Sequence, residues 1–406
     1  MGKRTQREPE VISVPEEKNI WGKRTLVLVL LVLGAYLITN GLIGMFRKQS
    51  GWNRIETKRP LEYSDEILFY YDLGEKRSAE YRVLTEIYTE ALSRSHDIFS
   101  LRTNNTGLRG LRMLNDSPNV AVEVEPELYS ALETFSNAGC RDIFLAPVYR
   151  IYGQLFVCME DYETAGLDPA RDRELKGYVD NLLSFINDPG AVDIELLGNN
   201  TVRLNMSEEY VRFCEENGIT DTVDFFWYTN AVIVDCIADV MADRGLTDGF
   251  IQSKDNFVRC LDGRDKEYRA YVYNREGNII RDVADLVYRG HIAMASLRDY
   301  TDKNDVGQPY YEYSDGTTVT PYISISDGLS HCSVTDIVVY SHSGSCTECA
   351  IQAAGLIRGD SFDPDRLQEG FEYVYTADRT VHSSDPDVRL ENIFDKDGVR
   401  YSFAAD

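Results

Sequence analysis

The chain has 406 residues, 43% of them hydrophobic, with 42 Lys and Arg against 67 Asp and Glu and a formal net charge of −25. This length and apolar content exclude a mini-protein and a compositionally disordered chain, and they predict one large core or two domains. The acidic balance excludes a nucleic-acid partner, because phosphate binding requires clustered Lys and Arg. No period of a few tens of residues repeats, which excludes a simple solenoid.

An uncharged apolar segment lies near the N-terminus, over residues 25–46. At about 1.5 Å per residue this segment reaches roughly 33 Å, enough to cross a bilayer core of about 30 Å. A cleavable signal peptide is the alternative, but the run is long and no small-x-small cleavage site follows it. We therefore predict a short cytoplasmic tail over residues 1–24, a single-pass transmembrane signal anchor over residues 25–46, and a large extracytoplasmic domain held at the cell membrane.

Residues 47–75 are polar and irregular and are expected to form a stalk, followed by one domain over residues 76–406. Apolar residues at helical spacing predict helices starting near Ala79 and Pro126 and over residues 172–187, 231–243 and 347–358. Alternating or β-branched runs predict strands over residues 120–124, a hairpin over 196–204, and strands over 249–253, 268–273, 278–283, 321–325, 333–341 and 371–376. Helices and strands mix without strict alternation, which favours an α+β fold.

The order of these segments resembles the ApbE family, the exported FAD:protein FMN transferases, over roughly residues 76–380. AGCRDIFLAPVYRIYG (138–153) resembles the family's "GGxFDITVGPLxxLWG". The segment beginning VDFFWYTNAVIVD (223–235) resembles "LDLGGIAKGYAVD". SVTDIVVYSHSGSCTECAIQAAGLIRG (333–359) resembles "SVTVxAxSxxxADALATALFVLG". The resemblance implies an ApbE-like, T-fold-related α+β domain preceded by a single N-terminal transmembrane helix.

The resemblance also implies FAD and Mg²⁺ as cofactors, and a flavoprotein acceptor or a membrane electron-transfer complex as partner. Matching positions give the following site residues: Asn230, Asp255, Asn256 and Asp142 for the cofactor, and Ser296 and Asp299 for catalysis. The family's metal-binding Asp and Thr, at i and i+4, fall on Glu348 and Gln352 in one register. In the neighbouring register they fall on Cys349 and Ala353, which could not hold Mg²⁺. Both registers remain open.

The loop that carries the resemblance departs from the family at its functional positions. Phe226 and Trp227 replace the Gly-Gly of "DLGGIAKG", and Asn230 replaces its Lys. A glycine at such a position lets the backbone approach a phosphate or a ring, and a Cβ prevents this approach. Two functions follow: an FMN transferase like its family, with a degenerate site, or a catalytically inactive binding or assembly subunit at the membrane with its flavin pocket plugged.

Two further motifs have ordinary alternatives. Cys346-x-x-Cys349 is consistent with half a zinc site shared with His331, Cys332 and His342, with a disulfide or redox pair, or with inert thiols. SDGTTVT (314–320) distantly resembles a flavinylation motif, but a hairpin turn explains it better.

Overall fold

The computed structural model describes residues 25–26, 28–30, 51–102, 107–264, 266–301, 309–396 and 398–406. The chain divides into two compact units, Met1–Gln49 and Ser50–Asp406. Residues 25–26 and 28–30 of the first unit are helical. The rest of the predicted anchor, and the whole predicted tail, lie outside the described residues. No helix within the described ranges is long and apolar enough to cross a membrane.

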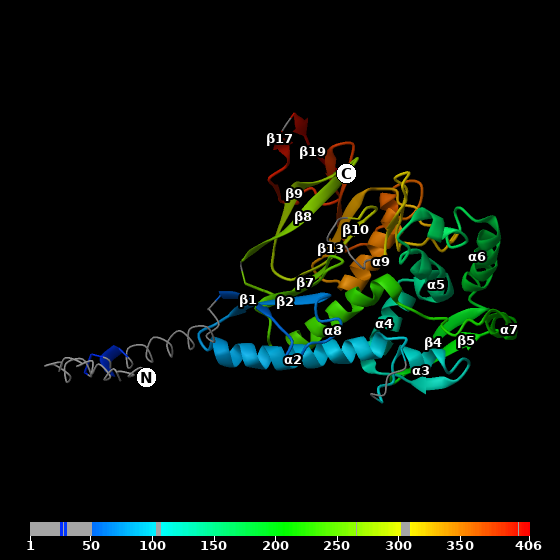
Figure 1. Cartoon of the computed structure of the whole chain (residues 1–406), viewed down its shortest axis with the longest axis horizontal. Coiled ribbons are helices and arrows are strands. Elements are labelled where there is room, and N and C mark those ends of the chain that lie inside the picture. Colours follow the sequence, from blue (N-terminus) through cyan, green and yellow to red (C-terminus); the bar gives the residue numbers. More distant parts are fainter. Residues whose placement is uncertain are drawn as a thin grey trace, which may run out of the picture. The chain divides into compact units, whose positions relative to one another are not determined.

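The second unit is built on a nine-stranded sheet (Figure 1). The strand order along the sheet is β1 (Gly51–Ile55), β2 (Ile67–Leu73), β6 (Gly249–Ser253), β7 (Phe257–Cys260), β10 (Ile292–Arg298), β13 (Asp336–Ser341), β14 (Glu372–Ala377), β15 (Thr380–Ser383) and β19 (Ser402–Ala405). Neighbours pair antiparallel except β15 and β19, which are parallel.

The predicted stalk is wrong for residues 51–73, because β1 and β2 lie in this sheet. In β2, Ile67, Phe69, Tyr71 and Leu73 are all at most 3% exposed, while the residues between them are partly exposed. This alternation buries one face of the strand. The folded domain therefore begins at β1 and not at residue 76.

Both faces of the central strands are buried. Ala293, Ala295 and Val339 belong to one core, whereas Met294 and Val338 belong to a second. The first core lies under α8 (Thr229–Asp243) and α9 (Cys346–Ile357), with α2 (Arg77–Phe99) and α4 (Pro126–Asn137) packed against these helices. The second core lies under the long hairpin of β8 (Glu267–Glu276) and β9 (Ile279–Arg289), which pairs with β16 (Leu390–Glu391).

The remaining elements surround the helical face. They are α3 (Leu111–Asn115), α5 (Ala146–Leu155), α6 (Arg173–Ile186), α7 (Glu208–Asn217), the sheet β3 (Ala121–Glu123)–β5 (Thr201–Met206)–β4 (Val192–Gly198), and the 3-10 turns η1 (Asp142–Leu145), η2 (Asp161–Thr164), η3 (Phe226–Tyr228) and η4 (Pro364–Arg366). Two short hairpins complete the fold: β11 (Tyr311–Glu312) with β12 (Thr318–Val319), and β17 (Asp395–Lys396) with β18 (Val399–Arg400).

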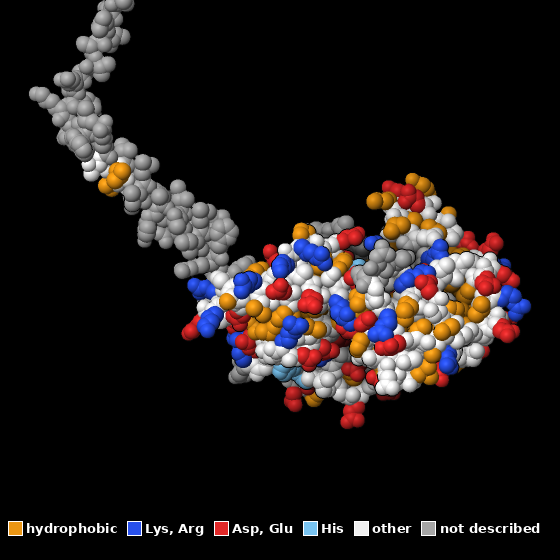
Figure 2. Space-filling model, turned by 90° about the horizontal axis from the view of Figure 1, so that it is seen from below, with side chains coloured by type: hydrophobic (Ala, Val, Ile, Leu, Met, Phe, Trp, Pro, Cys, Tyr) orange, Lys and Arg blue, Asp and Glu red, His pale blue; other side chains and the backbone are white. Residues whose placement is uncertain are grey.

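The predicted α+β class and nearly all predicted elements are confirmed. The exception is the strand expected over residues 321–325, where the backbone makes only an isolated bridge between Ile323 and Ser330. The surface in Figure 2 carries Lys and Arg interspersed with Asp and Glu, so the face shown there has no extended basic patch.

Candidate functional site

The loop that enters α8 has the backbone of a glycine at a phenylalanine. Phe226 has φ +44°, in the left-handed region that residues with a Cβ rarely adopt. Its N–H donates to Asp224 Oδ1 at 3.0 Å. Its ring stacks on Tyr149, with centroids 4.5 Å apart and planes inclined by 20°. The family motif that this loop resembles has a glycine here, a residue that adopts such a backbone readily, whereas this chain has an aromatic side chain.

An aromatic cavity of about 370 Å³ opens beside this loop. Its lining includes the rings of Phe226, Trp227, Phe257, Tyr310 and Tyr322, and the polar side chains of Glu66, Asn230, Lys254 and Asp255. Trp227 is only 6% exposed and meets Tyr322 edge to face at 5.0 Å. The cavity is therefore enclosed mainly by flat side chains, which suit the face of a planar ligand.

The predicted cofactor residues Asn230 and Asp255 meet in this aromatic cavity. Asn230 Nδ2 donates to Asp255 Oδ2 at 3.0 Å. Burial raises the pKa of Asp255 to about 6. The two residues come from different elements, the first turn of α8 and the turn between β6 and β7. Their contact is the part of the predicted site that the structure brings together.

A second cavity, of about 550 Å³, also has Phe226 in its lining and is called the outer cavity below. Its lining includes Tyr149, Arg150, Tyr178 and Asp224, and it shares Phe226 with the aromatic cavity. Burial raises the pKa of Asp224 to about 6. Phe226 therefore borders both cavities.

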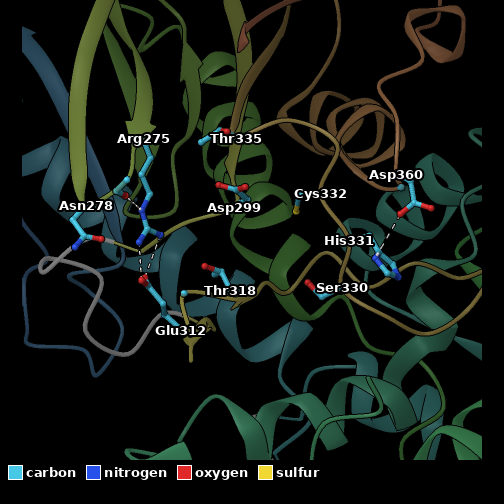
Figure 3. Close-up of a pocket in the computed structure, with 13 residues that line it drawn as sticks. Arg275, Asn278, Asp299, Glu312, Thr318, Ser330, His331, Cys332, Thr335 and Asp360 are labelled. Carbon is cyan, nitrogen blue, oxygen red and sulfur yellow. Dashed lines mark hydrogen bonds and ion pairs between the residues drawn. The ribbon is translucent and has the colours of Figure 1, made fainter. Parts of the chain in front are cut away.

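The predicted catalytic residue Asp299 lies elsewhere, in a polar cavity of about 650 Å³ (Figure 3). The cavity is lined mainly by Arg275, Asn278, Asp299, Glu312, Thr318, Ser330, His331, Cys332, Thr335 and Asp360. Burial raises the pKa of Asp299 to about 6. The polar and aromatic cavities share no lining residue.

The other predicted residues line none of these three cavities. Asp142 is 3% exposed, forms an ion pair with Arg358 at 2.5 Å, and accepts a hydrogen bond from Tyr228. Asn256 is exposed, with φ +66°, and its carbonyl accepts from the backbone N–H of Ser296. Asp142 is therefore held in a buried ion pair. Ser296 does not line the cavity that contains Asp299.

The predicted metal ligands are engaged in fixing helix α9. Glu348 Oε2 accepts from the Ser345 N–H at 2.8 Å, and Ser345 Oγ accepts from the Glu348 N–H at 3.1 Å, which is a capping box. Gln352 Oε1 accepts from the Gln368 N–H at 3.0 Å. Across the described ranges no group of three or more His, Cys, Asp or Glu is arranged to hold a metal ion. These residues do not fit Mg²⁺.

The two cysteines of the C-x-x-C motif are buried in the first turn of α9. Cys346 and Cys349 are 0% exposed, and their thiols lie 3.0 Å from the Val258 carbonyl and 3.4 Å from the Ala293 carbonyl. Burial raises the pKa of both thiols well above the usual range. All eight cysteines are free. The disulfide is therefore absent, and the geometry favours the interpretation as inert thiols.

Asp235, which was not predicted as a site residue, holds α9 in place. Its Oδ1 and Oδ2 accept from the backbone N–H groups of Cys346 and Thr347, both at 2.8 Å, and from the Thr347 hydroxyl at 2.7 Å. Arg259 Nη1 lies 3.3 Å away. The signal was present, because Asp224 and Asp235 match the two aspartates of "LDLGGIAKGYAVD".

Comparison with known proteins identifies solved structures with a similar fold, but no protein with a closely related sequence. No family model and no curated protein matches the chain. Among solved structures, the ApbE protein from Thermotoga maritima is 14% identical, with a TM-score of 0.54, over 80% of this chain and 94% of that one. The flavin transferase ApbE from Vibrio cholerae is 13% identical, with a TM-score of 0.50, over 81% and 95%. The chain thus has an ApbE-like fold, diverged far in sequence.

Proposed function

We propose that this protein is a membrane-anchored ApbE-like protein that has kept the flavin transferase fold and lost FMN transfer, and that it acts as a binding or assembly subunit. A fold alone does not specify chemistry, so the proposal depends on the site. The observation that carries it is Phe226, whose glycine-like backbone supports a ring where a ligand would need close backbone approach.

The aromatic cavity alone is small for FAD, because its volume of about 370 Å³ lies near the lower end of the range of about 300–1,000 Å³ that ligand cavities cover. Its charged residues are Glu66, Asp255 and Lys254, so two carboxylates face one ammonium group. An anionic diphosphate would be repelled there without a cation, and the residues predicted for Mg²⁺ are engaged in α9 contacts.

A second candidate function is the FMN transferase itself, acting on a hydroxyl of a flavoprotein acceptor. It is favoured by the Asn230–Asp255 hydrogen bond inside an aromatic cavity, since such a pair suits the polar edge of a flavin ring. It also accords with the coverage of more than nine-tenths of the transferases' length. The two candidates differ in whether FAD binds and is cleaved.

The membrane part of the proposal depends on residues 25–46, whose length and lack of charge suit a single span. With that anchor the acidic domain would lie outside the cytoplasm, where a partner in a membrane electron-transfer complex is within reach. Expression of the full chain, followed by carbonate extraction and protease protection, tests the placement. Release of the protein by carbonate, or protection of the domain on the cytoplasmic side, would contradict it.

The functional test is FAD titration of the full chain in detergent micelles, with and without Mg²⁺, followed by flavin fluorescence and by release of AMP. We expect no saturable FAD binding and no AMP. The double variant Phe226→Gly, Trp227→Gly removes the two rings and is expected to bind FAD more tightly than the natural chain. Saturable, Mg²⁺-dependent FAD binding with AMP release by the natural chain would establish the transferase instead.

A further inference from the structure

The polar cavity has a distinct chemical character, visible in Figure 3. Arg275 and Asn278 come from the β8–β9 hairpin, Asp299 follows β10, and Asp360 follows α9. Asp299 lies in the middle of the view, between an Arg275–Glu312 pair on one side and a His331–Asp360 pair on the other. The cavity is therefore a cleft with an Arg275–Glu312 ion pair at one side, the His331–Asp360 contact at the other, and a carboxylate between them.

The basic groups of this lining already have partners. Arg275 donates to Glu312 Oε1 at 2.6 Å and Oε2 at 3.2 Å, and its Nε donates to the Gly277 carbonyl at 2.8 Å. His331 lies 3.2 Å from Asp327 and 3.9 Å from Asp360. A ligand that brought an anionic group would have to break one of these pairs.

The carboxylate of Asp299, in contrast, accepts no hydrogen bond from another side chain in the described part of the protein, although the positive charge of Arg275 lowers its pKa. The backbone N–H of Asp299 is bonded to the Thr335 carbonyl at 2.9 Å. The side chain is half-buried, so water screens it incompletely. Counting the lining residues, the carboxylates of Asp299, Glu312 and Asp360 face one guanidinium. A half-buried carboxylate in this setting is stabilised by a donor that carries positive charge.

We propose that the polar cavity binds an organic amine, with the ammonium group donating to the carboxylate of Asp299. The hydroxyl oxygens of Thr318 and Thr335 border the same space and can accept the remaining N–H bonds. A free small amine and a lysine side chain present the same group, and the titration below uses one probe of each kind. The inference is independent of the proposed function, because it concerns a cavity that shares no lining residue with the aromatic one.

Amine binding should depend on pH through Asp299, whose pKa of about 6 in the free protein leaves it ionised at neutral pH. The positive charge of Arg275 lowers the pKa of Asp299, and the negative charge of Glu312 raises it. Asp336, on the adjacent strand β13, has a pKa of about 8 and is therefore mostly neutral at pH 7. The other titratable groups that line the cavity are His331, Cys332 and Asp360. Affinity is expected to fall as pH decreases through about 6, because Asp299 then takes up a proton.

The test is calorimetric titration of the full chain in detergent micelles with 1,4-diaminobutane, and with 1,4-butanediol as the uncharged analogue of the same length. Nα-acetyl-lysine amide serves as the second amine, to represent a side chain. We expect saturable binding of at least one amine and none of the diol. Asp299→Asn should weaken amine binding by about tenfold or more, since one charge interaction is lost.

Two variants make the result specific. Glu216→Gln removes the same charge from an exposed position on α7 and is expected to leave amine affinity unchanged. Glu312→Gln frees Arg275 to compete for Asp299 and is expected to weaken binding, which keeps the proposal testable if Asp299→Asn does not fold. Binding of the diol as tightly as the diamine, equal loss in Glu216→Gln, or no amine binding up to about 10 mM (about −2.7 kcal/mol) would overturn the proposal.

Discussion

The left-handed backbone at Phe226 predicts an inverted order of stability between two variants. Both Phe226→Ala and Phe226→Gly remove the ring that stacks on Tyr149, so they lose the same packing. They differ in the backbone, because a residue with a Cβ pays about 1–2 kcal/mol in the left-handed region and glycine does not. Glycine loses about 0.5–1 kcal/mol of that advantage through its unfolded-state entropy. Phe226→Gly is therefore expected to be more stable than Phe226→Ala by about 0.5–1 kcal/mol.

Phe213 supplies the matched control. It is also half-buried and stacks on an aromatic side chain, Tyr178, at 6.0 Å, but it lies inside helix α7. There glycine is about 1 kcal/mol less favourable than alanine, so Phe213→Ala should be the more stable variant. Urea denaturation of the full chain in micelles, followed by intrinsic fluorescence, measures all four free energies of unfolding. Equal or greater stability of Phe226→Ala over Phe226→Gly would refute a strained backbone at this position.

Three further predictions concern buried and half-buried polar groups. Asp142→Asn leaves Arg358 buried without its carboxylate and should lower the free energy of unfolding by about 3–5 kcal/mol in urea; a change below 1 kcal/mol would contradict a buried ion pair there. Glu348→Ala removes half of a capping box and should lower that free energy by about 1 kcal/mol, equally with and without Mg²⁺, whereas a loss seen only with Mg²⁺ would identify a metal ligand. Burial raises the pKa of Asp336 to about 8, with the Tyr300 hydroxyl bonded to it, so the folded state retains a proton that the unfolded state has lost. This contribution to stability is complete below about pH 4 and is lost as pH rises through 8. Between pH 5 and pH 8 the melting temperature should therefore decrease less in Asp336→Asn than in the natural chain. An equal decrease in both proteins would assign the pH dependence to other groups.

The sequence predicted most of the fold because burial is periodic in its elements. In α6, Val179, Leu182, Leu183 and Ile186 lie on one buried face, as their spacing predicts. The central strands were found because both of their faces are buried, which produces the continuous apolar run of residues 337–340. Strand β2 was missed although its alternation is regular, because the polar residues around it and the apolar segment before it favoured a stalk.

The site could be predicted only in part, because it depends on where strand ends and turns meet. Asn230 and Asp255 meet since both flank the face where α8 covers β6 and β7. Asp299 lies at the end of β10, where the β8–β9 hairpin and the segment after α9 form a separate cavity. The positive φ of Phe226 cannot be inferred from a phenylalanine; only the glycine at the matching position of the family motif indicates it.

The positions of this loop are under two different physical requirements: some are needed by the fold itself, and others are needed only by a ligand. Asp235 satisfies two buried backbone N–H groups at the start of α9, and its loss would leave them without acceptors whether or not a ligand binds. The glycine backbone at Phe226 is likewise part of how the loop enters α8. The open space that a glycine leaves at position 226, in contrast, is needed only by a ligand that occupies it. At Phe226 the fold keeps the backbone, and the ring that fills the space offsets part of the strain by stacking on Tyr149. Glycine would relieve the strain and leave the space open for a dinucleotide, so the combination found here supports the proposal of a protein that uses the fold without its transfer reaction.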